Sequence, residues 1–96
     1  MKPFIAIVHK EPDSAYGMSF PDAPGCFSAA DEIDDLFAQA GEALALWAEG
    51  LLEDGEALPE PRDLSALIAD PEWQESFAAA AMAIAVQAPL ETRRAA

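Results

Sequence analysis

Little in this sequence suits covalent or metal chemistry. Its 96 residues include one cysteine and one histidine, which excludes an internal disulfide and is too few for a zinc site of the Cys/His type. His9 has no serine or second cysteine at a recognisable spacing, so no catalytic triad is indicated. Cys26 follows a Pro-Gly turn, and we expect it to fill space in the core rather than to act as a nucleophile.

Positive charge is also scarce. Five Lys and Arg stand against 18 Asp and Glu, which gives a net charge of −13. Such a field repels nucleic-acid phosphates and anionic lipid and speeds the encounter with a basic protein, although it also simply keeps a small protein soluble. The charge is uneven, because residues 31–63 hold 11 acids and one base. The negative field therefore belongs to the central third of the chain.

Long apolar runs are missing as well. The run from Phe4 to Val8 is shorter than a signal-peptide core of about 7–15 residues. The longest run, Phe77 to Val86, is about half of the ~20 residues that a membrane-spanning helix requires. The cytosol is therefore the expected compartment. The hydrophobic fraction of 52% predicts a folded domain, and its small size predicts a thin margin of stability. Because oligomerisation would add to that margin, we expect a homo-oligomer, a dimer or a tetramer.

The first thirty residues predict three short strands. β-branched and aromatic residues fill 2–9, and bulky residues alternate with small ones in 15–20. The Pro12-Asp13 region between them is typical of a hairpin turn. A shorter third strand is predicted over 26–29.

A long amphipathic helix is predicted from Asp31 to Asp54, about 35 Å in length. We expect Asp31 to cap its first amides while Asp34 reaches back, and Gly55 to end it. Three-and-four spacing indicates an apolar side that packs on the sheet and an opposite acidic side. The predicted apolar side comprises Ile33, Leu36, Phe37, Ala40, Leu44, Trp47, Ala48, Leu51 and Leu52.

The last third predicts smaller elements. Two prolines make 58–62 a connector, 64–69 is typical of one or two helical turns, and Asp70-Pro71 indicates a helix cap or turn. Residues 77–86 are ambiguous between helix and strand. We favour a strand from about Met82, central enough in a sheet to tolerate small residues on one face.

A rigid turn ends the second predicted strand. Its sequence is Phe20-Pro21-Asp22-Ala23-Pro24-Gly25-Cys26. The prolines fix φ and remove donors, and Gly25 can take a positive φ that other residues avoid. The turn is followed by the acid-studded helix, which ends Leu52-Glu53-Asp54-Gly55, and then by Leu58-Pro59-Glu60-Pro61.

In this order and spacing, the pattern resembles the HicB antitoxin family over roughly residues 3–88. The resemblance implies an α+β fold, a β-β-β-α-β partial RNase H-like domain. In such a domain a three-stranded antiparallel meander and one later strand carry a long helix on one face. It also implies a function: binding and silencing a small basic HicA-type toxin, an mRNA-cleaving nuclease with a double-stranded-RNA-binding-like fold.

The chain departs from the family at its C-terminal end. Family members commonly continue into a DNA-binding domain that acts on their own promoter, but only seven residues follow Pro89. We therefore expect an antitoxin domain over 1–88 and a short tail over 89–96, with the DNA-binding domain absent or truncated. No nucleic-acid binding by this chain alone is expected.

The resemblance and the charge pattern together nominate site residues. The family motif turn comprises Phe20, Pro21, Asp22, Pro24, Gly25 and Cys26. Candidate toxin-binding residues are Asp34, Asp35, Glu42 and Glu49 on the acidic side of the helix, with Trp73 if it is exposed. No catalytic residue, metal ligand or cofactor is predicted.

Two other functions remain open. One is a non-enzymatic module that forms a homo-oligomer, a dimer or tetramer, and has no nuclease partner. The other is a metal-dependent nuclease built on Asp34 and Asp35. Successive helical residues point away from each other, which disfavours the nuclease.

Overall fold

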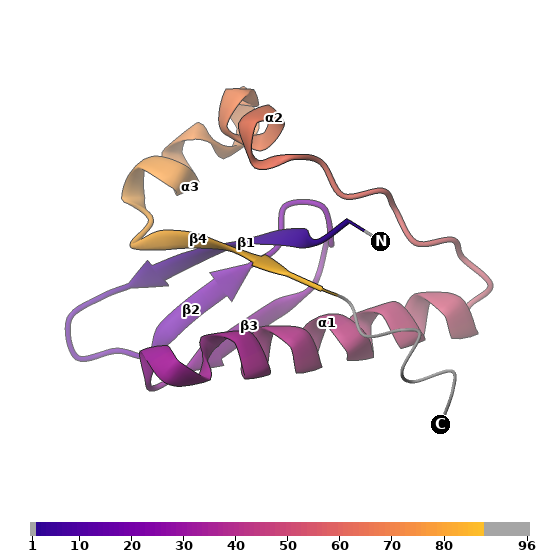
Figure 1. Cartoon of the computed structure of the whole chain (residues 1–96), viewed down its shortest axis with the longest axis horizontal. Helices are drawn as coiled ribbons and strands as arrows, with labels where there is room; N and C mark the ends of the chain where they lie inside the picture. The colour runs from indigo at the N-terminus through magenta and orange to yellow at the C-terminus, as the bar shows by residue number, and fades with distance from the viewer. Residues whose placement is uncertain (1, 88–96) are drawn as a thin grey trace.

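Four strands form one antiparallel sheet in the computed structural model, which describes residues 2–87 (Figure 1). The sheet order is β3-β2-β1-β4, so the last strand pairs with the first. This confirms the α+β class, the meander and the later strand, while the expected tail over 89–96 lies outside the described residues. The strands are β1 (Phe4–Lys10), β2 (Tyr16–Ser19), β3 (Phe27–Ala30) and β4 (Met82–Val86).

The turn between β1 and β2 forms where the sequence indicates. The Ser14 backbone N–H donates to the Glu11 carbonyl over 3.2 Å. Asp13 takes a φ of 61°, a left-handed conformation that aspartate tolerates better than most residues. The resulting register pairs Val8 with Met18. The predicted hairpin is thus confirmed.

The helices cover both faces of the sheet. Figure 1 shows α1 running along one side, with α2 and α3 on the other. At 1.5 Å per residue the 18 residues of α1 span about 27 Å, enough to cross the sheet. The helical elements are η1 (Ile33–Asp35, a 3-10 turn), α1 (Leu36–Glu53), α2 (Leu64–Ala69), η2 (Pro71–Trp73, a 3-10 turn) and α3 (Gln74–Ala79).

The main core lies between α1 and the sheet. Alternate residues of β1 face the helix, and their neighbours Ile5 and Ile7 point to the other side, because strand residues alternate between faces. On that second side Ile5, Ile7 and Leu67 of α2 are buried, and α3 packs against β1. The main core comprises Phe4, Ala6, Val8, Met18, Phe20, Ala23, Cys26, Ala30, Leu36, Ala40, Leu44, Ala48 and Val86.

The start of α1 differs from the sequence prediction. β3 continues to Ala30, so the next two residues are needed to turn the chain toward the helix. Glu32, extended at φ −115° and ψ 146°, then precedes η1 without a side-chain cap bond, and α1 has none either. The expected cap by Asp31 with Asp34 reaching back is therefore wrong.

Three of the predicted apolar residues near the ends of the helix are not buried. Ile33 belongs to the 3-10 turn, which winds at about 3.0 rather than 3.6 residues per turn, so it does not follow the apolar side of α1. Ile33 is 53% exposed and Phe37 is 62% exposed. Leu52, in the last turn of α1, is 40% exposed. These three residues, predicted to pack on the sheet, instead contact solvent.

The other helix ends form as expected. Gly55 takes a φ of 78°, and the N–H groups of Gly55 and Glu56 donate to the carbonyls of Leu52 and Leu51 over 3.0 and 2.9 Å. This pair of bonds is the Schellman arrangement that ends many helices at glycine. Asp70 caps η2 by accepting from the Glu72 N–H over 2.9 Å. The predicted helix end at Gly55 and the predicted cap at Asp70 are both confirmed.

The strand predicted from Met82 forms, but at an edge of the sheet. Within residues 2–87, β4 pairs only with β1. Ala83 and Ala85 are exposed on the side away from α1, whereas Val86 is buried toward it. The prediction of a central position was wrong, because the small residues face solvent rather than a crowded neighbour.

The placement of α1 predicts a contrast between two leucines. Leu44 is 0% exposed and Leu46 is 60% exposed. We expect Leu44→Ala to lower the free energy of unfolding by about 2–5 kcal/mol, because it removes packed methyl groups from the core. The matched Leu46→Ala should stay within about 0.5 kcal/mol of the unchanged chain. Equal losses in urea denaturation would contradict this orientation of the helix.

Candidate functional site

The motif segment 20–26 forms two successive turns between β2 and β3. The Ala23 N–H donates to the Phe20 carbonyl over 3.1 Å, and the Cys26 N–H donates to the Ala23 carbonyl over 3.0 Å. Pro24 and Gly25 occupy the central positions of the second turn, with Gly25 at φ 85°, as a type II turn requires. Phe20, Ala23 and Cys26 recur every third residue and are all buried. The predicted rigid turn is confirmed.

The turn is attached to α1 through Trp47. The indole Nε1 donates to the Pro24 carbonyl over 2.9 Å. The indole ring also meets Phe4 edge to face, with centroids 5.9 Å apart. Trp47 thus packs against the core, as predicted, and fixes the distance between the helix and the turn.

Asp22 attaches the same turn to the connector after α1. Its Oδ2 accepts the Arg62 backbone N–H over 2.7 Å, and its Oδ1 accepts from Arg62 Nε and Nη2 over 2.9 and 2.8 Å. Arg62 Nη1 also donates to Asp70 over 3.0 Å. The Glu72 backbone N–H and then the Arg62 guanidinium hold the pKa of Asp70 below its usual value. The motif aspartate is therefore a structural anchor.

Most of the candidate acids share one side of α1. Asp35, Glu42 and Glu49 recur every seven residues, which is nearly two helical turns. Asp35 and Glu42 are exposed and Glu49 is half-buried. Asp34 is exposed too, but as a neighbour of Asp35 it points to a different side. The structure therefore aligns three of the four candidate acids in one row.

Trp73 does not join this row. It belongs to η2, between α2 and α3, and these helices lie on the opposite side of the sheet from α1 (Figure 1). Its side chain is half-buried. A surface that contains the acids of α1 therefore does not extend to Trp73.

Leu46 is the residue on this side of α1 that sequence reasoning missed. It follows Glu42 by four residues and precedes Glu49 by three, so it lies among the acids. Its side chain is 60% exposed. The available signal was a large apolar residue that falls on the polar side of the helix rather than on the core side.

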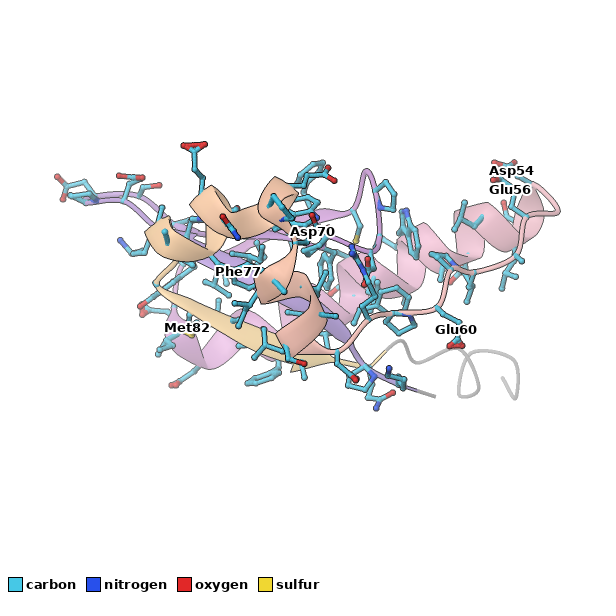
Figure 2. All side chains as sticks on the ribbon, turned by 90° about the horizontal axis from the view of Figure 1, so that it is seen from above. Asp54, Glu56, Glu60, Asp70, Phe77 and Met82 are labelled. Carbon is cyan, nitrogen blue, oxygen red and sulfur yellow. The ribbon has the colours of Figure 1, made fainter. Side chains whose placement is uncertain are left out.

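Further acids continue from the end of α1 onto the connector. Figure 2 shows Asp54 and Glu56 at the C-terminal end of the helix and Glu60 pointing away from the body of the domain. α1 contains no lysine or arginine. The outer side of α1 and the connector that follows it therefore carry negative charge along their length.

The candidate metal ligands and the lone cysteine and histidine can be placed in the structure. Within residues 2–87, no group of three or more His, Cys, Asp or Glu could hold a metal ion. Burial raises the pKa of the Cys26 thiol to about 11, so the thiol is uncharged at neutral pH, and its expected role as a core filler is confirmed. The half-buried His9 lies with Nε2 2.9 Å from the Ser76 carbonyl.

A shallow depression of about 360 Å³ lies beside the start of α1. The depression is lined by Ala15, Ala29, Ala30, Asp31, Asp35 and Gln39.

None of the helices among residues 2–87 combines the length and apolar character needed to cross a bilayer.

The anchor role of Asp22 can be tested by stability. We expect Asp22→Ala to lower the melting temperature clearly, because it removes all three bonds to Arg62 and releases the connector. Asp63→Ala is the matched control, since it breaks only the Lys2–Asp63 pair, whose side chains are 52% and 73% exposed. Exposed pairs contribute little, so the control should melt close to the unchanged chain. Equal melting temperatures for the two variants would contradict the anchor.

Comparisons with known sequences and structures identify relatives of this chain that agree with one another. The family model for HicB-like antitoxins of bacterial toxin–antitoxin systems matches residues 4–94. A chain of the HicA3 and HicB3 toxin–antitoxin complex superposes with a TM-score of 0.70 at 29% identity, covering 88% of this chain and 95% of that one. The Burkholderia pseudomallei antitoxin HicB superposes with a TM-score of 0.71 at 35% identity, covering 91% and 62%.

A longer phage protein is also related. An uncharacterised 14.9 kDa protein from the rep-hol intergenic region of Haemophilus phage HP1 is 40% identical over 63 residues, 66% of this chain and 47% of that protein. The chain thus spans about half the length of this relative. The family match, by contrast, includes the whole sheet, the motif turn and α1. This chain belongs to the HicB-like antitoxin family of bacterial toxin–antitoxin systems.

Proposed function

We propose that this chain is an antitoxin that binds a small basic HicA-type toxin and neutralises it by covering its RNA-binding and catalytic surface. The observation that carries the proposal is the row of acids on the outer side of α1 in a member of this family. A structural relative at 29% identity is a chain of a HicA3 and HicB3 complex, which supports a toxin of that class as the partner.

The chemistry of the row suits a protein that otherwise binds RNA. A toxin that cleaves mRNA has to attract phosphates, so it presents a cationic surface. The carboxylates of Asp35 and Glu42 are exposed and are spaced along a helix that the sheet holds in place. With no lysine or arginine in α1 to oppose them, they attract the same cationic groups and orient the encounter.

Neutralisation in this form needs no reaction. The antitoxin occupies the surface that RNA would use, and no bond forms or breaks. We place this action in the cytosol, where the toxin would meet mRNA. The acidic surface repels nucleic acid, so we assign no nucleic-acid binding to this chain alone.

Charge reversal on the row tests the proposal. We expect Asp35→Lys/Glu42→Lys to lower the association rate with a purified HicA-type toxin by about 10-fold or more at low salt. The remaining association should depend less on ionic strength. Stopped-flow mixing at two salt concentrations measures both effects, and an mRNA-cleavage assay reports the loss of neutralisation.

A control separates local charge from net charge. Glu11→Lys/Glu75→Lys changes the net charge by the same amount, but at exposed positions in the hairpin and α3. The control should keep an association rate close to that of the unchanged chain. An unchanged rate in the α1 variant, or an equal loss in the control, would remove the electrostatic basis of the proposal.

A second candidate function is a homo-oligomeric interaction module without a nuclease partner. The observation that favours it is the two uncharged edges of the sheet, since neither β3 nor β4 contains a charged residue or proline. Uncharged edge strands of this kind readily pair with another chain. A dimer or tetramer joined at such an edge would also add to the core of a small domain.

Light scattering after size-exclusion chromatography distinguishes the two candidates. If β4 joins the copies, Ala85→Lys is expected to dissociate the oligomer, because it places a charge on the exposed side of that edge strand. The same variant should still bind the toxin through α1. A stable homo-oligomer that ignores the toxin would favour the second candidate over the first.

A further inference from the structure

Leu46 occupies a position that packing within the domain does not explain. Its side chain is 60% exposed, whereas Leu44 and Ala48 on the same helix are 0% and 1% exposed. By helical geometry it points away from the buried side of α1. A leucine here contributes little to the core and leaves apolar surface in contact with water.

The surroundings of Leu46 are polar and acidic. Glu42 lies one turn before it and Glu53 lies two turns after it, and both are exposed. At 100° per residue, these residues fall within about 60° of one another together with two more near the start of the helix. We call this set the outer ridge, which comprises Asp35, Gln39, Glu42, Leu46 and Glu53.

Other exposed apolar residues do not belong to the outer ridge. Phe37, at 62% exposure, lies about 180° around α1 from Leu46. Leu64 and Ile68 lie on α2, which is on the other side of the sheet (Figure 1). Among the exposed large apolar side chains of α1, Leu46 is therefore the one that lies between acids of the outer ridge.

An apolar centre with a charged rim is the usual composition of a protein interface. A few buried central residues account for most of the affinity and slow the dissociation, while rim charges set the association rate. The charged groups of this rim are all carboxylates, so it repels phosphates and anionic lipid headgroups. The occupant that complements it is a protein surface with lysine or arginine around an apolar hollow.

We infer that Leu46 is the apolar anchor by which the outer ridge docks into an apolar hollow ringed by basic residues on the toxin. This inference rests on the proposed function and adds to it the contact that holds the complex together. Asp35 and Glu42 then orient the encounter, and Leu46 determines how long the partners stay together.

Replacement of Leu46 tests the inference. We expect Leu46→Gln in the full chain to weaken toxin binding at least about 10-fold, mostly through faster dissociation, with an association rate within about twofold of the unchanged chain. Its melting temperature should not change, because the side chain is exposed. Surface-based kinetics with the purified toxin and a thermal melt measure these quantities. Leu46→Met keeps the apolar contact and should bind like the unchanged chain.

The matched control is Leu52→Gln, which makes the same change on the same helix. Leu52 is 40% exposed and lies about 120° around α1 from Leu46. It should leave toxin affinity unchanged. Unchanged affinity in Leu46→Gln, or an equal loss in Leu52→Gln, would overturn the inference and leave the proposed function intact.

Two further outcomes identify what else would be wrong. If Leu46→Gln altered the oligomeric state but not toxin affinity, the outer ridge would be occupied by a second copy of the chain, and the inference would fail. If the unchanged chain did not bind the toxin at low ionic strength, the proposed function would fail, and this inference with it.

Discussion

The burial of one side of α1 against the sheet determines which side chains of the helix face solvent. Leu36, Ala40 and Leu44 belong to the same buried cluster as Phe4 and Val8 of β1, and α1 lies closest to β3. Because a helix is rigid, fixing its inner side also fixes the spacing and direction of every side chain on its outer side. The acids of α1 thus form a row only because the opposite side is buried.

The motif turn works as the joint that keeps this arrangement in register. It contacts α1 through Trp47 and the connector through Asp22, so one short segment holds both the helix and the segment that follows it. Its own apolar side chains point into the core. The residues that identify the family are therefore distinct from those to which we assign partner binding. The former hold the domain together, and the latter lie on the opposite side of α1.

Predictions that depended on near neighbours were the most reliable. The positive φ of Gly25 and Gly55 follows from turn chemistry within a few residues, and the order of elements follows from local residue patterns. The 3-10 start of α1 and the edge position of β4 depend instead on how strands and helix meet across the chain. The Asp22–Arg62 contact joins residues 40 positions apart, and no local pattern indicates it. Leu46 was missed, although the sequence places this apolar residue on the acidic side of the helix.

The helix that carries the row is intrinsically weak. It contains Gly41 and Gly50, each costing up to about 1 kcal/mol relative to alanine, and no side-chain cap at its first turn. Detached from the sheet, this segment would not keep its carboxylates aligned. Any ligand of that face therefore selects the folded chain and shifts the folding equilibrium toward it by mass action. Occupancy and resistance to proteolysis are consequently coupled: a protease that cuts the unfolded chain competes with the ligand for the same molecules.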